Sequence, residues 1–277
     1  MTRRMRRLIG RVAFFVLLIA LLGWTLFPFY WAVVSSLKTG TDLFGSALLP
    51  PRPTLSNYAS ALNGPFLLAI GNSVVVASSV VLISLVVSVS AAFALGRMPF
   101  RGRGTLLMII LAASMFPQVA VLSGVFELVR GLGLYNTRSG LILADLILTL
   151  PLTIWTLTIF IRALPRELEE AAVIDGARPW EVLVKVFLPL LTPALATTGL
   201  LAFIAAWNEF LFALTLTLDR GRTVPVAISQ ISGVSQHELP WGVIMAASVI
   251  VTVPLIALVL FFQRRIIAGL TAGAVKG

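Results

Sequence analysis

The sequence contains no cysteine and a single histidine, His237. Without cysteine the chain has neither a disulfide nor a thiolate that would ligate a metal or act as a nucleophile. Charged residues make up only 12% of the 277 residues, whereas 58% are hydrophobic. Soluble domains carry about 25% charged residues, so this composition excludes a water-soluble enzyme and indicates an integral membrane protein.

The sequence also lacks the short motifs that mark catalytic sites. Its only lysines are Lys38, Lys185 and Lys276, and none follows a glycine-rich phosphate loop. Neither a His-Glu-x-x-His nor a Gly-x-Ser-x-Gly pattern occurs. We therefore expect no catalytic residue, no cofactor and no metal, and we expect any energy source to lie on another subunit.

Long apolar stretches dominate what is present. A membrane-spanning helix needs about 20 apolar residues, and the stretches long enough predict an all-α polytopic protein with six transmembrane helices. These lie at about 12–34, 69–95, 105–126, 139–161, 193–214 and 243–263. The predicted organisation is an N-terminal anchor (1–34), an extracytoplasmic loop (35–68), a five-helix core (69–263) and a tail (264–277). Within the core we expect a polar cytoplasmic hairpin at 164–189 and an extracytoplasmic loop at 215–242.

The basic residues predict the orientation. The N-terminus, the loops after the second and fourth spans and the tail together hold 15 of the 21 Lys and Arg residues, and the other side holds 6. Basic loops remain cytoplasmic, so we expect both termini in the cytoplasm. The net charge of +10 is thereby explained by orientation and contact with the lipid bilayer, which weakens a nucleic-acid interpretation. The first span is too long for a signal peptide and lacks a cleavage site, so we interpret it as a retained anchor.

The segment between the fourth and fifth spans is far more polar than the rest of the chain. Five of the eleven acidic residues lie between Leu164 and Pro189. Pro165 suits a first helical position, and the glutamates that follow place negative charge at the positive end of a helix dipole. Gly176 tolerates positive φ and predicts the end of that helix. Pro179 predicts a second start, and Pro189 predicts the end of the second helix.

Two interpretations of this hairpin remain open from local chemistry. Ala171 and Ala172 give a flat surface that a partner can approach closely, and Trp180, Val182 and Val186 predict an apolar face. The hairpin then docks on another protein. Alternatively, it is an interfacial element that lies on lipid.

The hairpin resembles the EAA motif of binding-protein-dependent ABC importer permeases. The matching residues are Glu170-Ala171-Ala172, then Gly176 after three residues, then Val186-x-Leu188-Pro189 after nine more, with valine where isoleucine is usual. Asp175-Gly176-Ala177 also agrees with the family. The resemblance implies that the hairpin forms the coupling helices that sit in a cleft of a cytoplasmic ATPase. The residues to which it assigns this contact are Glu169, Glu170, Ala171, Ala172, Asp175, Gly176, Ala177, Arg178, Val186, Leu188 and Pro189.

Further matches resemble the carbohydrate branch of this family. They are Pro53-Thr54-Leu55-Ser56-Asn57-Tyr58, Phe116-Pro117-Gln118, Ala206-Trp207-Asn208-Glu209-Phe210 and the tail from Gln263 to Gly277. The tail is similar to that of the second permease subunit of the maltose and trehalose type, which implies ATPase contacts for Leu270, Thr271, Gly273, Lys276 and Gly277.

The resemblance implies a type I ABC importer permease fold in a prokaryotic cytoplasmic membrane. It also implies the partners: a second homologous permease subunit, two ATPase subunits and an extracytoplasmic sugar-binding protein. The implied function is the permease subunit of an ATP-driven importer of a di- or oligosaccharide.

Polar residues inside the spans give candidates for the solute pathway or the permease interface, namely Pro117, Gln118, Trp207, Asn208 and Glu209. Glu209 has two open interpretations, a pathway residue or a structural hydrogen bond. Trp207 is more typical of packing than of a sugar platform. For Asp145, near the end of the fourth span, we favour simple solvation, and for the serines of the second span, such as Ser84 and Ser88, we favour helix packing.

Three alternative functions deserve comparison. A proton-coupled carrier would use Glu209 or Asp145, but it would show inverted repeats, and none is visible. An intramembrane enzyme would need convergent polar groups at one membrane face, whereas the acids cluster in the hairpin. An ABC permease for an amino acid or a peptide would lack the Asn57-Tyr58 and tail features, and an ABC permease for glycerol phosphate is a further alternative.

Overall fold

The computed structural model describes residues 3–218, 221–231 and 239–274, and every element within them is helical. In chain order the helices are α1 (Arg3–Ser36), η1 (Gly40–Phe44), α2 (Ser56–Ala61), α3 (Gly64–Arg97), α4 (Arg103–Ala113), α5 (Gln118–Gly131), α6 (Arg138–Ala163), α7 (Glu167–Ile174), α8 (Pro179–Glu181), η2 (Val182–Phe187), α9 (Leu188–Leu190), α10 (Thr192–Trp207), α11 (Leu211–Leu216), α12 (Val224–Ser229) and α13 (Trp241–Ala274). Among the described residues four helices are long and apolar enough to cross a membrane, or up to six if each bent pair forms one span. The prediction of a polytopic all-α protein is confirmed, with six spans as its upper limit.

The chain divides into two compact units, of which the first comprises residues 1–63 and 230–253. Within it, the amide nitrogen of Asn57 donates to the carbonyls of Ser36 and Lys38, both at 2.8 Å. The Tyr58 hydroxyl lies 2.7 Å from Ser36 Oγ. A Cβ atom at Gly242 would lie 2.6 Å from the Asn57 side chain. The Asn57-Tyr58 pair is therefore a structural fastening between α2 and the end of α1.

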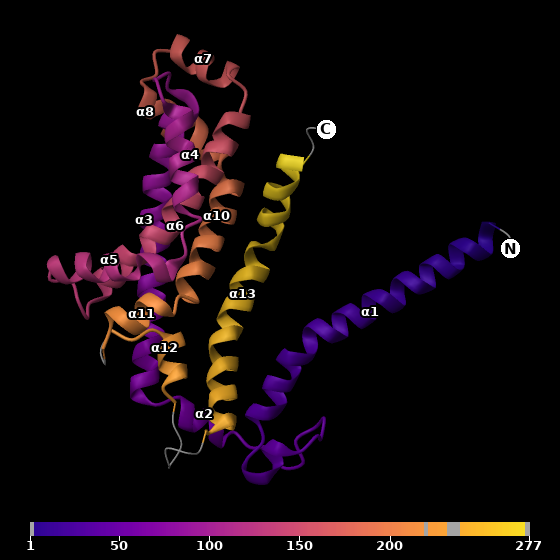
Figure 1. Ribbon diagram of the computed structural model, residues 1–277. Helices are drawn as coiled ribbons and strands as arrows, with labels where there is room; N and C mark the ends of the chain where they lie inside the picture. Colours follow the sequence, from indigo (N-terminus) through magenta and orange to yellow (C-terminus); the bar gives the residue numbers. More distant parts are fainter. Residues whose placement is uncertain (1–2, 219–220, 232–238, 275–277) are drawn as a thin grey trace. The chain divides into compact units, whose positions relative to one another are not determined.

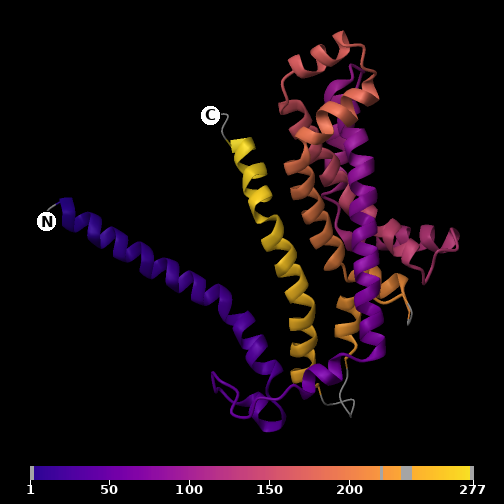
Figure 2. The same cartoon turned by 180° about the vertical axis from the view of Figure 1, so that it is seen from behind.

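The second unit comprises residues 64–229 and 254–277, and α3, α6 and α10 form its core. These three helices lie side by side (Figure 1), and the view from behind shows the same arrangement (Figure 2). Small and hydroxyl residues allow the close approach that membrane helices require. Ser84 on α3 and Thr149 on α6 are hydrogen-bonded at 2.9 Å, and a Cβ atom at Gly96 would lie 2.9 Å from Ile161. Ser84 and Ser88 are buried, which agrees with the packing role predicted for them.

Two of the predicted spans are broken. Helix α4 ends at Ala113 and α5 begins at Gln118 with a bend of 97°, because Pro117 lacks the N–H that would continue the helix. The predicted span 193–214 is wrong as one helix, since α10 ends at Trp207 and α11 begins at Leu211. Asp145 corrects another expectation, because its side chain is only 1% exposed rather than solvated.

Candidate functional site

The predicted hairpin forms two helical arms at one end of the α3, α6 and α10 bundle (Figure 1). The first arm, α7, carries three glutamates in its first turn, which complement the helix dipole. It begins at Glu167, so Pro165 precedes the helix and the predicted start at Pro165 is wrong. Gly176 has a φ of 82°, and Ala177 N donates to Ala172 O at 2.9 Å. This is the glycine-terminated turn that the sequence predicted.

The second arm begins at Pro179 and continues beyond the expected stop. Glu181 accepts from Arg178 N at 2.9 Å and from Lys185 Nζ at 2.8 Å, which closes the first turn. The arm then passes through a π-helical segment, η2, and on to Leu190. Pro189 therefore lies within the helical run, and the expected end at Pro189 is wrong. The chain turns by 79° before α10.

The two arms leave some of their apolar side chains exposed and bury others against the bundle. Ile174 is 85% exposed and Trp180 58% exposed. Val182 and Phe187, by contrast, are buried against α3 and α6, and Val186 packs on the same cluster. The apolar face predicted for Val182 and Val186 is thus turned toward the chain's own core. Of the residues assigned by resemblance, those that are exposed are Glu170, Ala171, Asp175, Gly176, Arg178 and Pro189, and those that are partly buried are Glu169, Ala172, Ala177, Val186 and Leu188.

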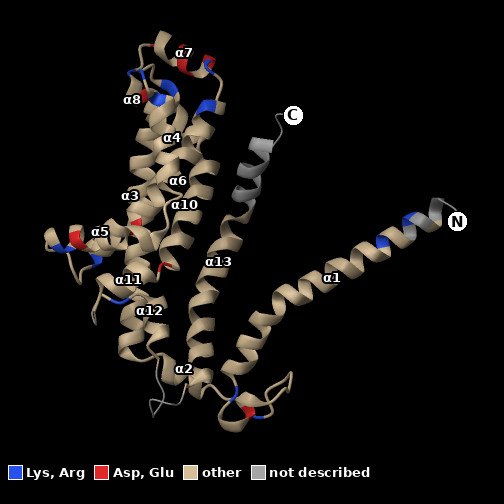
Figure 3. Cartoon of the chain, in the orientation of Figure 1, with Lys and Arg blue, Asp and Glu red and all other residues tan. Residues whose placement is uncertain are grey.

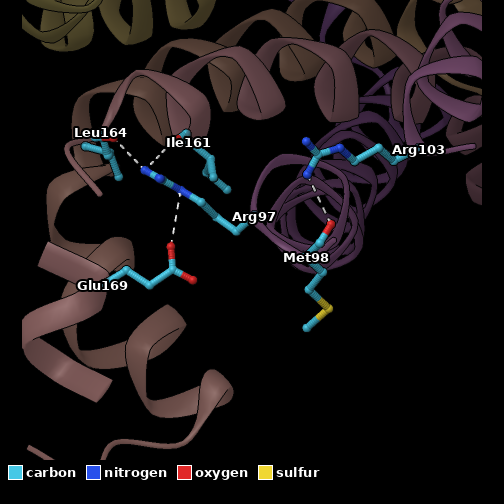
Figure 4. Close-up of polar contacts among 6 residues, drawn as sticks. All are labelled: Arg97, Met98, Arg103, Ile161, Leu164 and Glu169. Atoms are coloured by element: carbon cyan, nitrogen blue, oxygen red, sulfur yellow. Dashed lines mark hydrogen bonds and ion pairs between the residues drawn. The ribbon is translucent and has the colours of Figure 1, made fainter. Parts of the chain in front are cut away.

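Arg97, at the end of α3, connects the hairpin to the bundle (Figure 4). Its guanidinium group donates to Ile161 O at 2.9 Å and to Leu164 O at 2.6 Å. Its Nε atom lies 3.8 Å from a carboxylate oxygen of Glu169, and its Cζ atom lies 5.1 Å from the centre of the Phe187 ring. One side chain therefore joins α3, the end of α6 and both arms. No local pattern in the sequence indicates this contact, because Arg97 and Glu169 are far apart along the chain.

Replacing Arg97 with lysine tests this connection. Lysine keeps the charge but lacks the planar fork that reaches two carbonyls and a carboxylate at once. We expect the Arg97→Lys subunit to lose about 1–2 kcal/mol of stability, seen as a lower melting temperature of the purified protein. An Arg101→Lys control, in an exposed position, should melt like the wild type. Equal melting of both variants would contradict a connecting role for Arg97.

The residues predicted for the pathway or interface meet at the break between α10 and α11. Glu209 accepts from Gln118 Nε2 at 2.6 Å, from Phe212 N at 2.7 Å and from Ala213 N at 2.9 Å. Gln118 is the first residue of α5, so this carboxylate connects the start of α5 to the start of α11. The geometry favours the structural interpretation of Glu209.

The other predicted pathway residues divide between packing and exposure. Trp207 is 5% exposed and stacks on Phe203 at 5.5 Å between ring centres, which favours packing. Asn208 is exposed and donates to Ile204 O, and Pro117 is also exposed.

For the predicted tail residues the structure describes only the helix in which some of them lie. Leu270, Thr271 and Gly273 fall in the last turns of α13, whereas Lys276 and Gly277 lie outside the described residues, as does His237 of the second outer loop. Within the described part of the chain no group of His, Asp and Glu could hold a metal ion.

Charge is concentrated where the hairpin meets the bundle. Figure 3 shows acidic and basic residues gathered at the α7 and α8 end of the bundle, while α3, α6 and α10 are almost free of them along their length. A compact charged element at the end of an apolar bundle is suited to contact a water-soluble partner.

Comparisons with known proteins agree with this arrangement. Residues 84–271 match the family described as "Binding-protein-dependent transport system inner membrane component". The chain is similar to the trehalose/maltose transport system permease protein MalG of Thermococcus litoralis, with 45% identity over 91% of this chain and 92% of the relative. It is 41% identical to the trehalose transport system permease protein SugB of Mycobacterium tuberculosis over 92% of this chain and 94% of that one. A chain of the crystal structure of a bacterial ABC transporter for import of the acidic polysaccharide alginate superimposes with a TM-score of 0.82, at 26% identity and over 95% of this chain and 98% of the other.

Proposed function

This chain belongs to the family of binding-protein-dependent transport system inner membrane components, and from that premise we propose that it is the second permease subunit of an ATP-driven importer for a di- or oligosaccharide of the trehalose or maltose class. Permease subunits of this family are not enzymes, and ATP hydrolysis occurs on a separate subunit. The observation that supports the sugar most strongly is the 45% identity with a trehalose/maltose permease over nearly the whole chain.

The proposed assembly contains this chain, a second homologous permease, two cytoplasmic ATPase subunits and an extracytoplasmic sugar-binding protein. Both termini and the 164–189 hairpin face the cytoplasm in this arrangement. The excess of basic residues on that side supports the orientation.

The hairpin is the proposed contact with the ATPase. Its exposed residues Ala171, Ile174 and Trp180 offer the partner a small apolar surface. Arg97 and the cluster around Phe187 hold the two arms on α3 and α6. Because the hairpin is packed on the bundle, closure of the ATPases moves it as a rigid body and shifts the spans between inward and outward openings. Such coupling requires that nucleotide and substrate favour different states of one element. Residues 270–277 supply a second contact with the ATPase.

The test is reconstitution of the complete transporter in lipid vesicles. ATP hydrolysis is measured while the binding protein is supplied empty or loaded with trehalose, maltose, an amino acid or glycerol phosphate. We expect a several-fold stimulation only with the disaccharides, because the loaded binding protein stabilises the state in which the ATPases close. If an amino acid or glycerol phosphate stimulates ATP hydrolysis and neither disaccharide does, the transported substrate is that solute and the assignment to a sugar is wrong. Sugar uptake that persists without the ATPase and stops with a protonophore would contradict the proposal as a whole.

A further inference from the structure

A cavity of about 410 Å³ lies beside the hairpin, and its lining is unusually basic. Its walls are formed by Gly96, Arg97, Arg103, Gly104, Arg162 and Arg166. These residues come from the end of α3, the start of α4, the last turn of α6 and the segment that joins α6 to α7. An adjoining hollow of about 700 Å³ shares four of these residues and extends to Glu169 and Glu170.

The positive charge of the cavity is largely unneutralised. Arg103 donates to Met98 O at 3.3 Å (Figure 4), and Arg162 donates to Leu95 O at 3.0 Å. Both acceptors are uncharged carbonyls. Within the described part of the chain the only carboxylate paired with any of the four arginines is Glu169, which lies 3.8 Å from Arg97. Guanidinium groups stay charged at all physiological pH values, so the cavity has the electrostatics of an anion site.

The start of α4 adds a second attraction for an anion. No side chain caps this eleven-residue helix, and its N-cap is Gly102 with a φ of 85°. The first N–H groups of a helix carry partial positive charge and bind phosphate well. Gly104 lines the cavity, and a Cβ atom there would meet nothing within 4 Å. The backbone is thus open to a ligand at the point where the arginines converge.

The surroundings favour a lipid phosphate over a free one. Met98 and Phe100, from the turn between α3 and α4, and Leu106, from the first turn of α4, are 41–44% exposed, and they offer apolar contact close to the charged cavity. A phospholipid uses both features, whereas inorganic phosphate uses only the charge. Basic pockets at the ends of membrane helices bind anionic lipid headgroups.

We propose that this cavity binds the phosphodiester headgroup of an anionic phospholipid, held by Arg103, Arg162 and Arg166 and by the start of α4. The bound phosphate lies next to Arg97 and therefore attracts the guanidinium that Glu169 of α7 contacts. Headgroup binding and hairpin position are linked through this shared arginine.

The test measures binding of short-chain dioctanoyl phosphatidylglycerol to the purified complete transporter in neutral detergent. The variants are Arg103→Gln and Arg166→Gln, singly and together, because the only side-chain hydrogen bond that the structure assigns to either is the weak one from Arg103. Arg166→Lys keeps the charge, and Arg101→Gln removes a charge of the same loop that does not line the cavity. We expect the lipid to raise the melting temperature of the wild type and of Arg101→Gln. The double variant should bind it about 30-fold more weakly, and Arg166→Lys should recover most of the loss relative to Arg166→Gln.

Additional measurements distinguish an anionic lipid from a neutral lipid and from free inorganic phosphate. Dioctanoyl phosphatidylcholine and inorganic phosphate, at equal concentration, should leave the melting temperature unchanged. Equal stabilisation by inorganic phosphate would overturn the lipid assignment, and so would unchanged lipid binding by the double variant. Loss of the ATPase from the double variant in lipid-free detergent, with its retention by Arg101→Gln, would instead make the cavity a contact with the ATPase. None of these measurements depends on the transported solute, so they remain decisive if the proposed sugar is wrong.

Discussion

Replacing Gly176 with valine is expected to abolish sugar uptake while leaving the subunit in the membrane. Gly176 has a φ of 82°, and no atom lies within 4 Å of the Cβ position. The effect therefore arises from backbone strain alone, since β-branched residues are genuine outliers at positive φ and each such residue costs about 1–3 kcal/mol. The strain is relieved by opening the turn in which Gly176 N donates to Val173 O and Ala177 N to Ala172 O, which displaces α7 from the second arm.

Two variants control for strain as such. Gly133 has a φ of 69° and equally open surroundings, but it lies outside the hairpin, so Gly133→Val carries a similar strain without moving α7. Gly176→Asn keeps a residue that tolerates the left-handed conformation. We expect near-normal uptake and ATPase retention in both controls. Normal uptake together with normal ATPase binding in Gly176→Val would contradict the coupling role of the hairpin.

The sequence predicted the hairpin because its signals are local. Gly176 and Pro179 each determine the backbone within one turn of their own position, so the end of α7 and the start of α8 could be placed from the residues alone. The buried side of the second arm could not, because η2 is π-helical. Val182 and Phe187 are five residues apart, and in a π-helix that spacing brings both onto the buried side. An α-helical interpretation places Val182 on the face predicted to dock on a partner, whereas in the structure Val182 is buried.

Contacts between segments that are far apart in the sequence could not be predicted from local sequence patterns. The ion pair between Arg97 and Glu169, and the burial of Asp145 among packed helices, depend on how α3, α6 and the hairpin come together. Nothing in the spacing of these residues indicates that approach. Asn57 illustrates the converse case, since its motif was recognised by resemblance, and only the structure shows that its amide fastens α2 to the end of α1.

Removing the Glu209 side chain is expected to destabilise the subunit severely. Glu209 is 7% exposed, and its two oxygens accept from Gln118 Nε2 and from the backbone N–H groups of Phe212 and Ala213. Glu209→Ala leaves all three donors without this acceptor in a buried site, and each such donor costs about 1–3 kcal/mol. We expect a total loss of about 3–9 kcal/mol, measured as loss of the monodisperse complex on heating followed by size-exclusion chromatography.

Matched variants distinguish the structural role of Glu209 from a role in the solute pathway. Gln118→Ala removes one of the three donors and should cost only about 1 kcal/mol, and Glu127→Ala, at an exposed position of α5, should have no effect. In Glu209→Gln one oxygen still accepts from Gln118 and Phe212, but the new amide nitrogen faces the Ala213 N–H as a second donor. A capping role therefore predicts that stability and uptake fall together, in the order Gln118→Ala, Glu209→Gln, Glu209→Ala. If Glu209→Gln keeps wild-type stability and loses transport, the carboxylate acts on the solute pathway, and the capping interpretation is wrong.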